Sequence, residues 1–227
     1  MEAIARLLVS KVLDWLFRDQ GTQPVRGVLP GEKKWQVVAY PRLNRYEHWR
    51  SILLDPPNAV YKDPFTNATL YLGSSFNAAD HHGLRQRGVG HVVNVTQCIP
   101  NFHVGVDYIR VPARDVEGAR LFFNEGHAFH VTVRFIHDCL CTGKSVLVHC
   151  FAGSSRSAAV VLLYLMWRRH YLTLVGGYDD LVRKRPCVAV NRRFLLEVKR
   201  LVPALHRHTH RLARAPKIRI QARLTSV

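Results

Sequence analysis

The chain has 227 residues, of which 48% are hydrophobic and 10% aromatic. That is enough for one domain with a real core, and it excludes general disorder. No apolar run reaches the roughly 18–20 residues that a membrane span needs, and we expect no signal peptide because Glu2, Lys11 and Asp14 interrupt the N-terminal apolar stretch. The formal net charge is +17, and residues 161–227 supply most of it, with fifteen basic against three acidic side chains.

Charge and cysteine content suggest partners and a compartment. The basic C-terminal third favours acidic partner surfaces, although it would also attract nucleic acid or anionic lipid. Five cysteines are an odd, sparse number for a disulfide framework. We therefore expect a reducing compartment, the cytoplasm, with the nucleus as the alternative location.

Residues 1–60 are expected to form an N-terminal extension. Apolar side chains at helical spacing predict an amphipathic helix over residues 1–19. Glycines and prolines then predict a linker over residues 20–34, whereas residues 35–64 predict no defined element. The charge of the helix is mixed, so we expect it to dock on the catalytic domain or on a partner protein, with attachment to a membrane surface as the alternative.

Residues 61–203 are expected to form an α/β domain, followed by a basic C-terminal tail over residues 204–227. Strands are predicted over residues 70–72, 91–96, 107–111 and 145–149, the last two buried. Helices are predicted over residues 74–87, 120–141, 157–170, 173–184 and 191–205, the last with Asn191 as its N-cap. This alternation indicates a central, mostly parallel sheet flanked by helices.

Residues 146–157 read VLVHCFAGSSRS, in which an apolar strand runs into a loop of small residues and then a helix. Successive N–H groups of such a loop can form a nest for a phosphate, assisted by the helix N-terminus. Gly153 permits a backbone angle that a larger residue would resist. Arg156 supplies a planar fork able to hold two phosphate oxygens.

Cys150 lies at the floor of this ring of donors. The positive potential that holds a phosphate also lowers the pKa of a thiol, so one constellation can bind phosphate and create the thiolate that attacks it. The alternative is a buried, inert cysteine beside a surface arginine. The strand before the loop, the glycine within it and the helix after it favour the reactive site.

Residues 149–157, HCFAGSSRS, resemble the HCxAGxSRS signature of dual-specificity protein phosphatases, in the cysteine-dependent protein tyrosine phosphatase superfamily. The resemblance extends over about residues 68–203. It includes LYLG at 70–73, GVGHVVN at 88–94, and a closing pattern of Arg185, Pro186, Asn191 and Phe194. It implies the dual-specificity-phosphatase fold and metal-independent hydrolysis of phosphoproteins through a cysteinyl phosphate, without a cofactor.

The same resemblance implies roles for individual residues. The general acid is Asp115, 35 positions before Cys150, with Glu117 as the next candidate. Ser157 would hydrogen-bond the cysteine sulfur, or simply cap the following helix, and His149 would support the loop. The phosphate-binding loop would comprise Phe151, Ala152, Gly153, Ser154, Ser155 and Arg156. The thirteen histidines of the chain show no ligand spacing, so no metal site is expected.

The substrate and partners stay open. Neutral side chains between Cys150 and Arg156 favour phosphotyrosine and phosphoserine or phosphothreonine in proteins, because related inositol-lipid phosphatases place lysines there. An RNA 5′-phosphatase, a phosphoinositide phosphatase and a non-catalytic protein that docks phosphoproteins or kinases are the alternatives. Residues 214–220 loosely fit a basic kinase-docking motif, so a protein kinase is a candidate partner.

A thiolate activated for attack on phosphorus is also open to oxidation to sulfenic acid. A second thiol within reach would protect it by forming a disulfide. Cys98 follows the predicted strand at 91–96, whose C-terminal end the family fold places near the phosphate loop. Cys98 is therefore the predicted redox partner, with Cys187 as the runner-up.

Overall fold

The computed structural model describes residues 27–30, 35–38, 43, 45–116, 119–122, 128–168 and 173–212. The predicted helix 1–19, the candidate acid Glu117 and residues 213–227 of the predicted tail lie outside the described residues.

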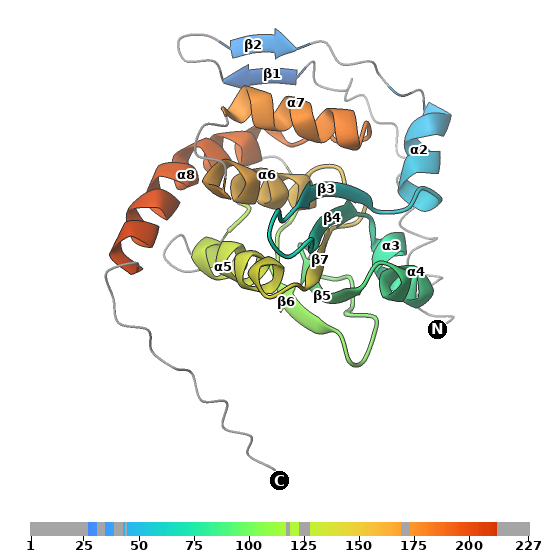
Figure 1. The fold of residues 1–227 in the computed structure, drawn as a ribbon. Coiled ribbons are helices and arrows are strands. Elements are labelled where there is room, and N and C mark those ends of the chain that lie inside the picture. The colour runs from blue at the N-terminus through green and yellow to red at the C-terminus, as the bar shows by residue number, and fades with distance from the viewer. Residues whose placement is uncertain are drawn as a thin grey trace.

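A five-stranded sheet forms the centre of the molecule (Figure 1). The strand order is β3-β4-β7-β5-β6. Strands β3 and β4 pair antiparallel, and the other pairs are parallel. The predicted central, mostly parallel sheet is confirmed. The strands are β3 (Asn58–Lys62), β4 (Thr69–Gly73), β5 (Val89–Asn94), β6 (Asp107–Arg110) and β7 (Ser145–His149).

Helices cover both faces of the sheet. The larger core lies on the face covered by α5 (Ala128–Cys141), α6 (Arg156–Arg168), α7 (Leu174–Lys184) and α8 (Arg192–Leu212). The short helices α3 (Ser75–Ala79) and α4 (His81–Gln86) cover the other face. In β7, Val146 and Val148 point into the larger core and Leu147 into the smaller one, as the alternation of a strand requires.

Two further elements precede the sheet. Strands β1 (Gly27–Pro30) and β2 (Trp35–Val38) form a separate antiparallel hairpin, which lies beside α7 (Figure 1). Helix α2 (Arg45–Leu53) follows. The linker predicted over residues 20–34 is wrong at residues 27–30, because these pair with β2 as a strand. The sequence predicted no element over residues 35–64, and residues 58–60, assigned to the extension, belong to β3.

Two predicted helices are wrong in extent. The helix predicted over residues 74–87 is divided into α3 and α4, because the Asp80 side chain accepts the N–H of Gly83 at 3.0 Å and starts a new helix. The helix predicted over 120–141 does not start at residue 120, and the structure describes α5 over Ala128–Cys141. Leu121 and Phe122, which the prediction placed in its first turn, are buried and lie outside any helix.

The last helix and one strand also differ from the predictions. Helix α8 begins after Asn191, whose Oδ1 accepts the N–H of Arg193 at 2.9 Å, so the predicted cap is confirmed. The helix continues to Leu212, which places residues 204–212 of the predicted tail in a helix. Strand β6 was expected to be buried, but Asp107 and Arg110 are exposed because β6 is an edge strand. No helix in the described ranges is both long and apolar enough to cross a membrane.

Candidate active site

Cys150 directly follows β7, the central strand of the sheet, and only 1% of it is exposed. Four backbone carbonyl groups of the loop after it accept hydrogen bonds from residues outside the loop, and these bonds hold the loop in place. The carbonyl oxygen of Phe151 accepts the Ser75 N–H at 2.9 Å, and that of Ser154 accepts the Ala189 N–H at 3.0 Å. The Arg185 guanidinium donates to the two carbonyl oxygens between them, those of Ala152 at 3.1 Å and Gly153 at 3.0 Å.

These outward carbonyls determine where the loop amides point. In a trans peptide the C=O and the following N–H are directed oppositely, so the amides that follow these carbonyls turn toward the inside of the loop. The Gly153 N–H agrees, since it donates to Cys150 Sγ at 3.3 Å. The loop therefore presents a concave set of N–H donors above the sulfur, which is the form of an anion nest.

Gly153 is required for this shape. Its φ is +72°, and a Cβ placed on it would lie 2.4 Å from the carbonyl oxygen of Gly73 in β4. The backbone angle expected from the sequence is confirmed, and the close approach to β4 is a second reason for glycine.

Arg185 supports the loop through its hydrogen bonds to the loop carbonyls, and it is completely buried. Besides its bonds to the loop, its Nη1 donates to Asn58 Oδ1 at 2.7 Å. The sequence singled out Arg185 only as part of a pattern and did not predict this role. Its position directly before Pro186, at the end of a helix, was the available signal.

The Cys150 thiol is surrounded by groups that stabilise its anion. Ser157 Oγ donates to Cys150 Sγ at 3.2 Å, as expected from the resemblance. Burial alone would raise the pKa of Cys150, but the charge of Arg156 and hydrogen bonds from Ser157 outweigh it. The pKa of Cys150 is therefore lowered, although the nearby Asp115 opposes the shift.

Asp115 and Arg156 lie together at the edge of the loop. Asp115 Oδ2 is 3.6 Å from Arg156 Nε, and Asp115 Oδ1 accepts from Ser155 Oγ at 3.1 Å. The Asp115 side chain is 31% exposed, which leaves it accessible to a substrate. Among the described residues Arg156 Nε has no hydrogen-bond partner, and Nη1 makes only a 3.4 Å bond to the Ala113 carbonyl oxygen. The guanidinium thus keeps donors for a phosphate.

His149, the last residue of β7, is fully buried. Its Nδ1 lies 3.2 Å from the carbonyl oxygen of Cys150 and therefore donates to it. Burial, together with the charges of Arg110 and Arg156, lowers the pKa of His149 to about 4. A neutral imidazole that holds the start of the loop fits the supporting role implied by the resemblance.

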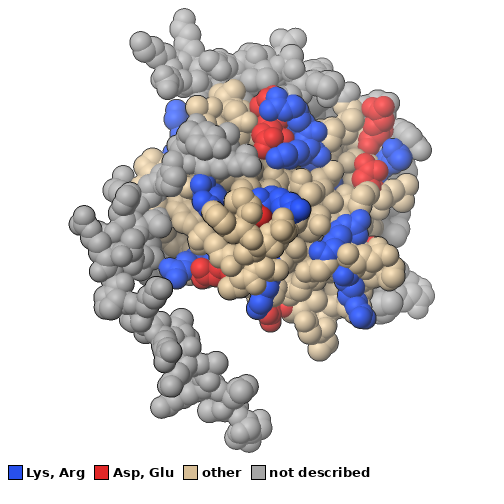
Figure 2. All heavy atoms as spheres, viewed as in Figure 1, with Lys and Arg blue, Asp and Glu red and all other residues tan. Residues whose placement is uncertain are grey.

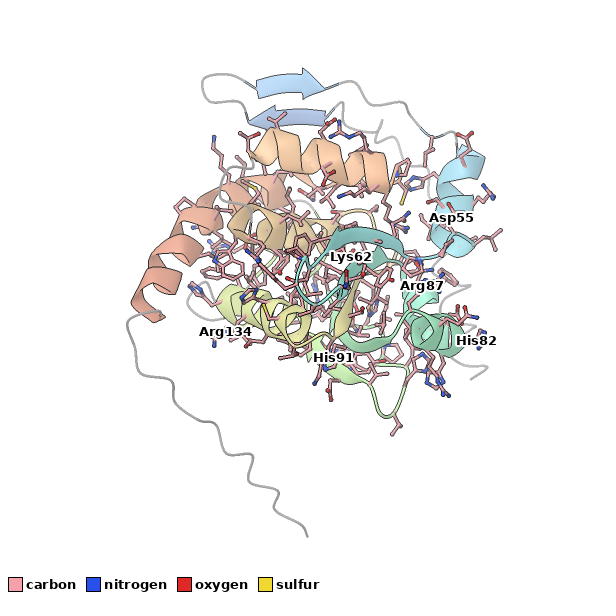
Figure 3. All side chains as sticks on the ribbon, viewed as in Figure 1. Asp55, Lys62, His82, Arg87, His91 and Arg134 are labelled. Carbon is pink, nitrogen blue, oxygen red and sulfur yellow. The ribbon has the colours of Figure 1, made fainter. Side chains whose placement is uncertain are left out.

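Helix α2 packs against the phosphate-binding loop, which the sequence did not predict. Trp49 and Ile52 of α2 are buried in a small cluster that includes Phe76, Phe151 and Ala152. The end of this segment is fastened to α3, since Asn77 Nδ2 donates to the carbonyl oxygen of Asp55 at 2.9 Å. Asp55 is labelled in Figure 3, just beyond the end of α2.

The two candidate redox cysteines have different surroundings. Cys98 is exposed and lies in the loop after β5. Cys187 is 1% exposed and lies between Arg185 and Ala189, which both hold the phosphate-binding loop. Burial raises the pKa of Cys187. Within the described ranges no three His, Cys, Asp or Glu side chains are grouped as a metal site.

Comparison with known proteins agrees with this geometry. The sequence model of the family described as "Dual specificity phosphatase, catalytic domain" matches residues 70–201, more than half of the chain. Protein phosphatase Slingshot of Drosophila melanogaster is 32% identical over 147 residues, which are 64% of this chain and 13% of that protein. Human dual specificity protein phosphatase 9 is 35% identical over 148 residues, 62% of this chain and 37% of that protein.

Solved structures show the same relationship. The crystal structure of a variant of human DUSP28 superimposes with a TM-score of 0.58 at 30% identity, covering 68% of this chain and 99% of that one. The chain spans well under half the length of the two curated relatives above. On the family match over residues 70–201, the chain belongs to the dual specificity phosphatases of the protein tyrosine phosphatase superfamily.

Proposed function

We propose that this protein dephosphorylates phosphotyrosine and phosphoserine or phosphothreonine in proteins through a cysteinyl-phosphate intermediate. One observation carries the proposal: the Cys150 thiol, its pKa lowered, lies at the floor of the amide nest, with Arg156 and Asp115 at the edge of the loop. This set supplies a nucleophile, an electrophile-binding site and a proton donor together.

The first chemical step transfers the phosphoryl group to the protein. The phosphate dianion binds to the loop amides and to the Arg156 fork. The Cys150 thiolate attacks phosphorus, the bond from phosphorus to the substrate oxygen breaks, and protonated Asp115 donates its proton to that oxygen. The dephosphorylated side chain leaves as a neutral alcohol or phenol.

The second step releases inorganic phosphate. A water molecule attacks phosphorus of the cysteinyl phosphate, and the Asp115 carboxylate accepts its proton. The bond from sulfur to phosphorus breaks and the electron pair returns to Cys150 Sγ. Ser157 stabilises the leaving thiolate through its 3.2 Å hydrogen bond.

The choice of protein substrates rests on the loop side chains. The five residues between Cys150 and Arg156 carry no charge, whereas inositol phosphates favour basic side chains at that place. On the face drawn in Figure 2, basic and acidic side chains lie next to each other in several places. A face that carries charges of both signs can meet varied protein partners.

The test compares kcat/KM on phosphotyrosine and phosphothreonine peptides, triphosphorylated RNA and phosphoinositides at fixed salt. We expect the peptides to be preferred and Cys150→Ser to abolish turnover. A preference above about 100-fold for RNA or lipid, equivalent to about 2.7 kcal/mol, would overturn the choice of substrate. Trapping with an Asp115→Ala/Cys150→Ser protein, followed by mass spectrometry, would identify substrates in lysate.

The proposal extends to location and partners. A reducing compartment, the cytoplasm or the nucleus, suits a catalytic thiolate, and the chain's basic excess suits acidic protein surfaces. Imaging of a fluorescent fusion tests the location. A kinase partner bound through residues 214–220 would be lost on deleting those residues.

A further inference from the structure

Glu197 of α8 joins that helix to the segment that follows the general-acid loop. The side chain is only 6% exposed. Its Oε2 accepts the N–H of Leu121 at 2.8 Å, and its Oε1 accepts the N–H of Phe122 at 3.1 Å. Each carboxylate oxygen thus holds one backbone amide from a segment more than seventy residues away in the sequence.

We propose that Glu197 is a positioning residue for catalysis: by holding the far end of the loop that carries Asp115, it sets how well Asp115 protonates the leaving oxygen. This inference rests on the proposed phosphatase function. It gives Glu197 no contact with the substrate, and its effect would reach the reaction only through Asp115.

The contacts of Asp115 itself are compatible with an effect of Glu197 on its position. Asp115 is a third exposed, its hydrogen bond to Ser155 is 3.1 Å long, and its separation from Arg156 Nε is 3.6 Å. The next residue, Val116, is 56% exposed. Arg114, Asp115 and Val116 are all exposed. The nearest buried residues that the structure describes on either side are Ala113 at 1% and Leu121 at 0% exposure. The placement of Asp115 therefore depends on where those two residues are held.

The backbone amides of Leu121 and Phe122 need hydrogen-bond acceptors, and a side chain provides them. Leu121 and Phe122 are buried outside any helix or strand, so their amides require hydrogen bonds from elsewhere. Glu197 satisfies both with charge-assisted bonds, which are roughly twice as strong as neutral ones. The buried face of α8 around Glu197 is otherwise apolar, with Phe194, Val198 and Leu201. A charged side chain on that face is costly unless its hydrogen bonds are made.

Helix α8 also reaches the near end of the loop. The Asn191 N–H donates to Ser155 Oγ at 3.2 Å, and the same hydroxyl donates to Asp115. Glu197 lies six positions after Asn191, which corresponds to about 9 Å along a helix. Helix α8 and the Asn191 cap before it therefore reach both Asp115, through Ser155, and the end of the loop, through Glu197.

The test is the dependence of the rate on the leaving group in a Glu197→Gln variant. Glutamine has the same shape but one acceptor oxygen, so its NH₂ group would face one of the two amides. We expect kcat/KM to fall about 10-fold or more for phenyl phosphate, whose leaving oxygen needs a proton, and less than about 3-fold for an activated nitrophenyl phosphate. Asp115→Asn should show the same pattern more strongly.

Asp63 offers a matched control. It too is a buried carboxylate, whose Oδ1 accepts the N–H groups of Phe65 and Thr66 at 3.0 and 3.1 Å, in the turn between β3 and β4. Asp63→Asn should lower the melting temperature but leave the leaving-group dependence unchanged. In the Asp115→Asn background, Glu197→Gln should cause no further loss on phenyl phosphate, because the two changes remove the same contribution.

An equal loss for both classes of leaving group, or no loss, would overturn the proposal for Glu197. So would full additivity with Asp115→Asn. If Glu197→Gln fails to fold, Glu197→Asp keeps the charge with a shorter reach, and it should steepen the leaving-group dependence in the same direction. Failure of the proposed function looks different, because the wild-type protein would then turn over neither aryl phosphate, or Cys150→Ser would remain active.

Discussion

Arg185 donates from Nε to the carbonyl oxygen of Gly153 at 3.0 Å while being completely shielded from solvent. Arg185 also donates to the Ala152 carbonyl oxygen and to Asn58 Oδ1, so its guanidinium connects the loop to the start of β3. We expect Arg185→Lys to lower the free energy of unfolding by about 2–4 kcal/mol, since a compact ammonium cannot reach all three acceptors. Activity should fall at least about 10-fold because the amide nest loses its shape.

Urea denaturation and kcat/KM on a phosphotyrosine peptide check this prediction. Arg183→Lys is the control, because Arg183 lies on the exposed side of α7 and pairs with Asp179 of the same helix. A stable and fully active Arg185→Lys protein would show that the loop keeps its conformation without the hydrogen bonds of the Arg185 guanidinium.

Gly153→Ala should abolish most of the activity. The new Cβ would meet the Gly73 carbonyl oxygen, and the residue would also be forced into the left-handed region. Gly143 separates the two effects, since its φ is +79° but nothing lies within 4 Å of an added Cβ. We expect Gly143→Ala to cost about 1–2 kcal/mol of stability and to leave kcat unchanged. Thermal unfolding and steady-state kinetics distinguish the two variants.

The contrast between these residues shows what the sequence could predict. Cys150, Gly153, Arg156 and Ser157 lie within residues 150–157, which run from the end of β7 into the start of α6, so local spacing was enough to place them in one site. Each strand expected after residue 68 was found, because hydrophobic patterns are also local. The support from Arg185 and Glu197 depends on tertiary contacts between distant segments, and local patterns carry no information about those.

The region before the sheet was unpredictable for a related reason. Prolines and aromatic residues around α2 give no clear period, and the helix is defined by packing against Phe76 and Phe151. The late start of α5 has a similar cause. The Leu121 and Phe122 amides are bound by Glu197, so tertiary hydrogen bonds prevail over local helix propensity there.

His149 should make the protein sensitive to acid. Its pKa in the folded state is about 4, below the ordinary value of 6.5, so below pH 6.5 the unfolded chain binds a proton that the folded protein does not. Stability from this group is therefore lost as the pH falls from about 6.5 toward 4, by up to about 3 kcal/mol. His149→Asn keeps a donor for the Cys150 carbonyl but does not titrate.

Urea denaturation at pH 7.5 and at pH 5 measures the effect for both proteins. The loss on acidification should be smaller in His149→Asn than in the wild type, and the difference between the two losses isolates this residue from other titrating groups. Equal losses would mean that His149 is already protonated in the folded protein at pH 5.

Ser157→Ala should raise the pKa of Cys150, because the hydroxyl bond is one of the contributions that lower it. Iodoacetamide inactivation followed against pH reports this pKa directly, and the midpoint should move to higher pH in the variant. Ser154→Ala is the control, since no hydrogen bond from the Ser154 side chain to the sulfur is found in the described part of the chain. An unchanged midpoint in Ser157→Ala would contradict the assignment of the 3.2 Å contact.

Peroxide should inactivate the protein reversibly, and Cys98 remains the predicted partner of oxidised Cys150. Non-reducing peptide mapping should show a Cys98–Cys150 peptide, and dithiothreitol should restore less activity to Cys98→Ser than to the wild type. A Cys150–Cys187 peptide would instead assign the role to the buried thiol beside the loop. Full recovery of Cys98→Ser without a Cys98 peptide would contradict the prediction.

The central position of β7 has a consequence for motion. Strand β7 is hydrogen-bonded on both sides, to β4 and β5, so its amides are released only when the whole sheet opens. In hydrogen exchange they should be among the slowest of the molecule, while those of the edge strand β6 exchange by local fraying. Cys150 thus directly follows a strand that is paired on both sides, whereas the exposed Asp115 follows β6, one of the two edge strands of the sheet.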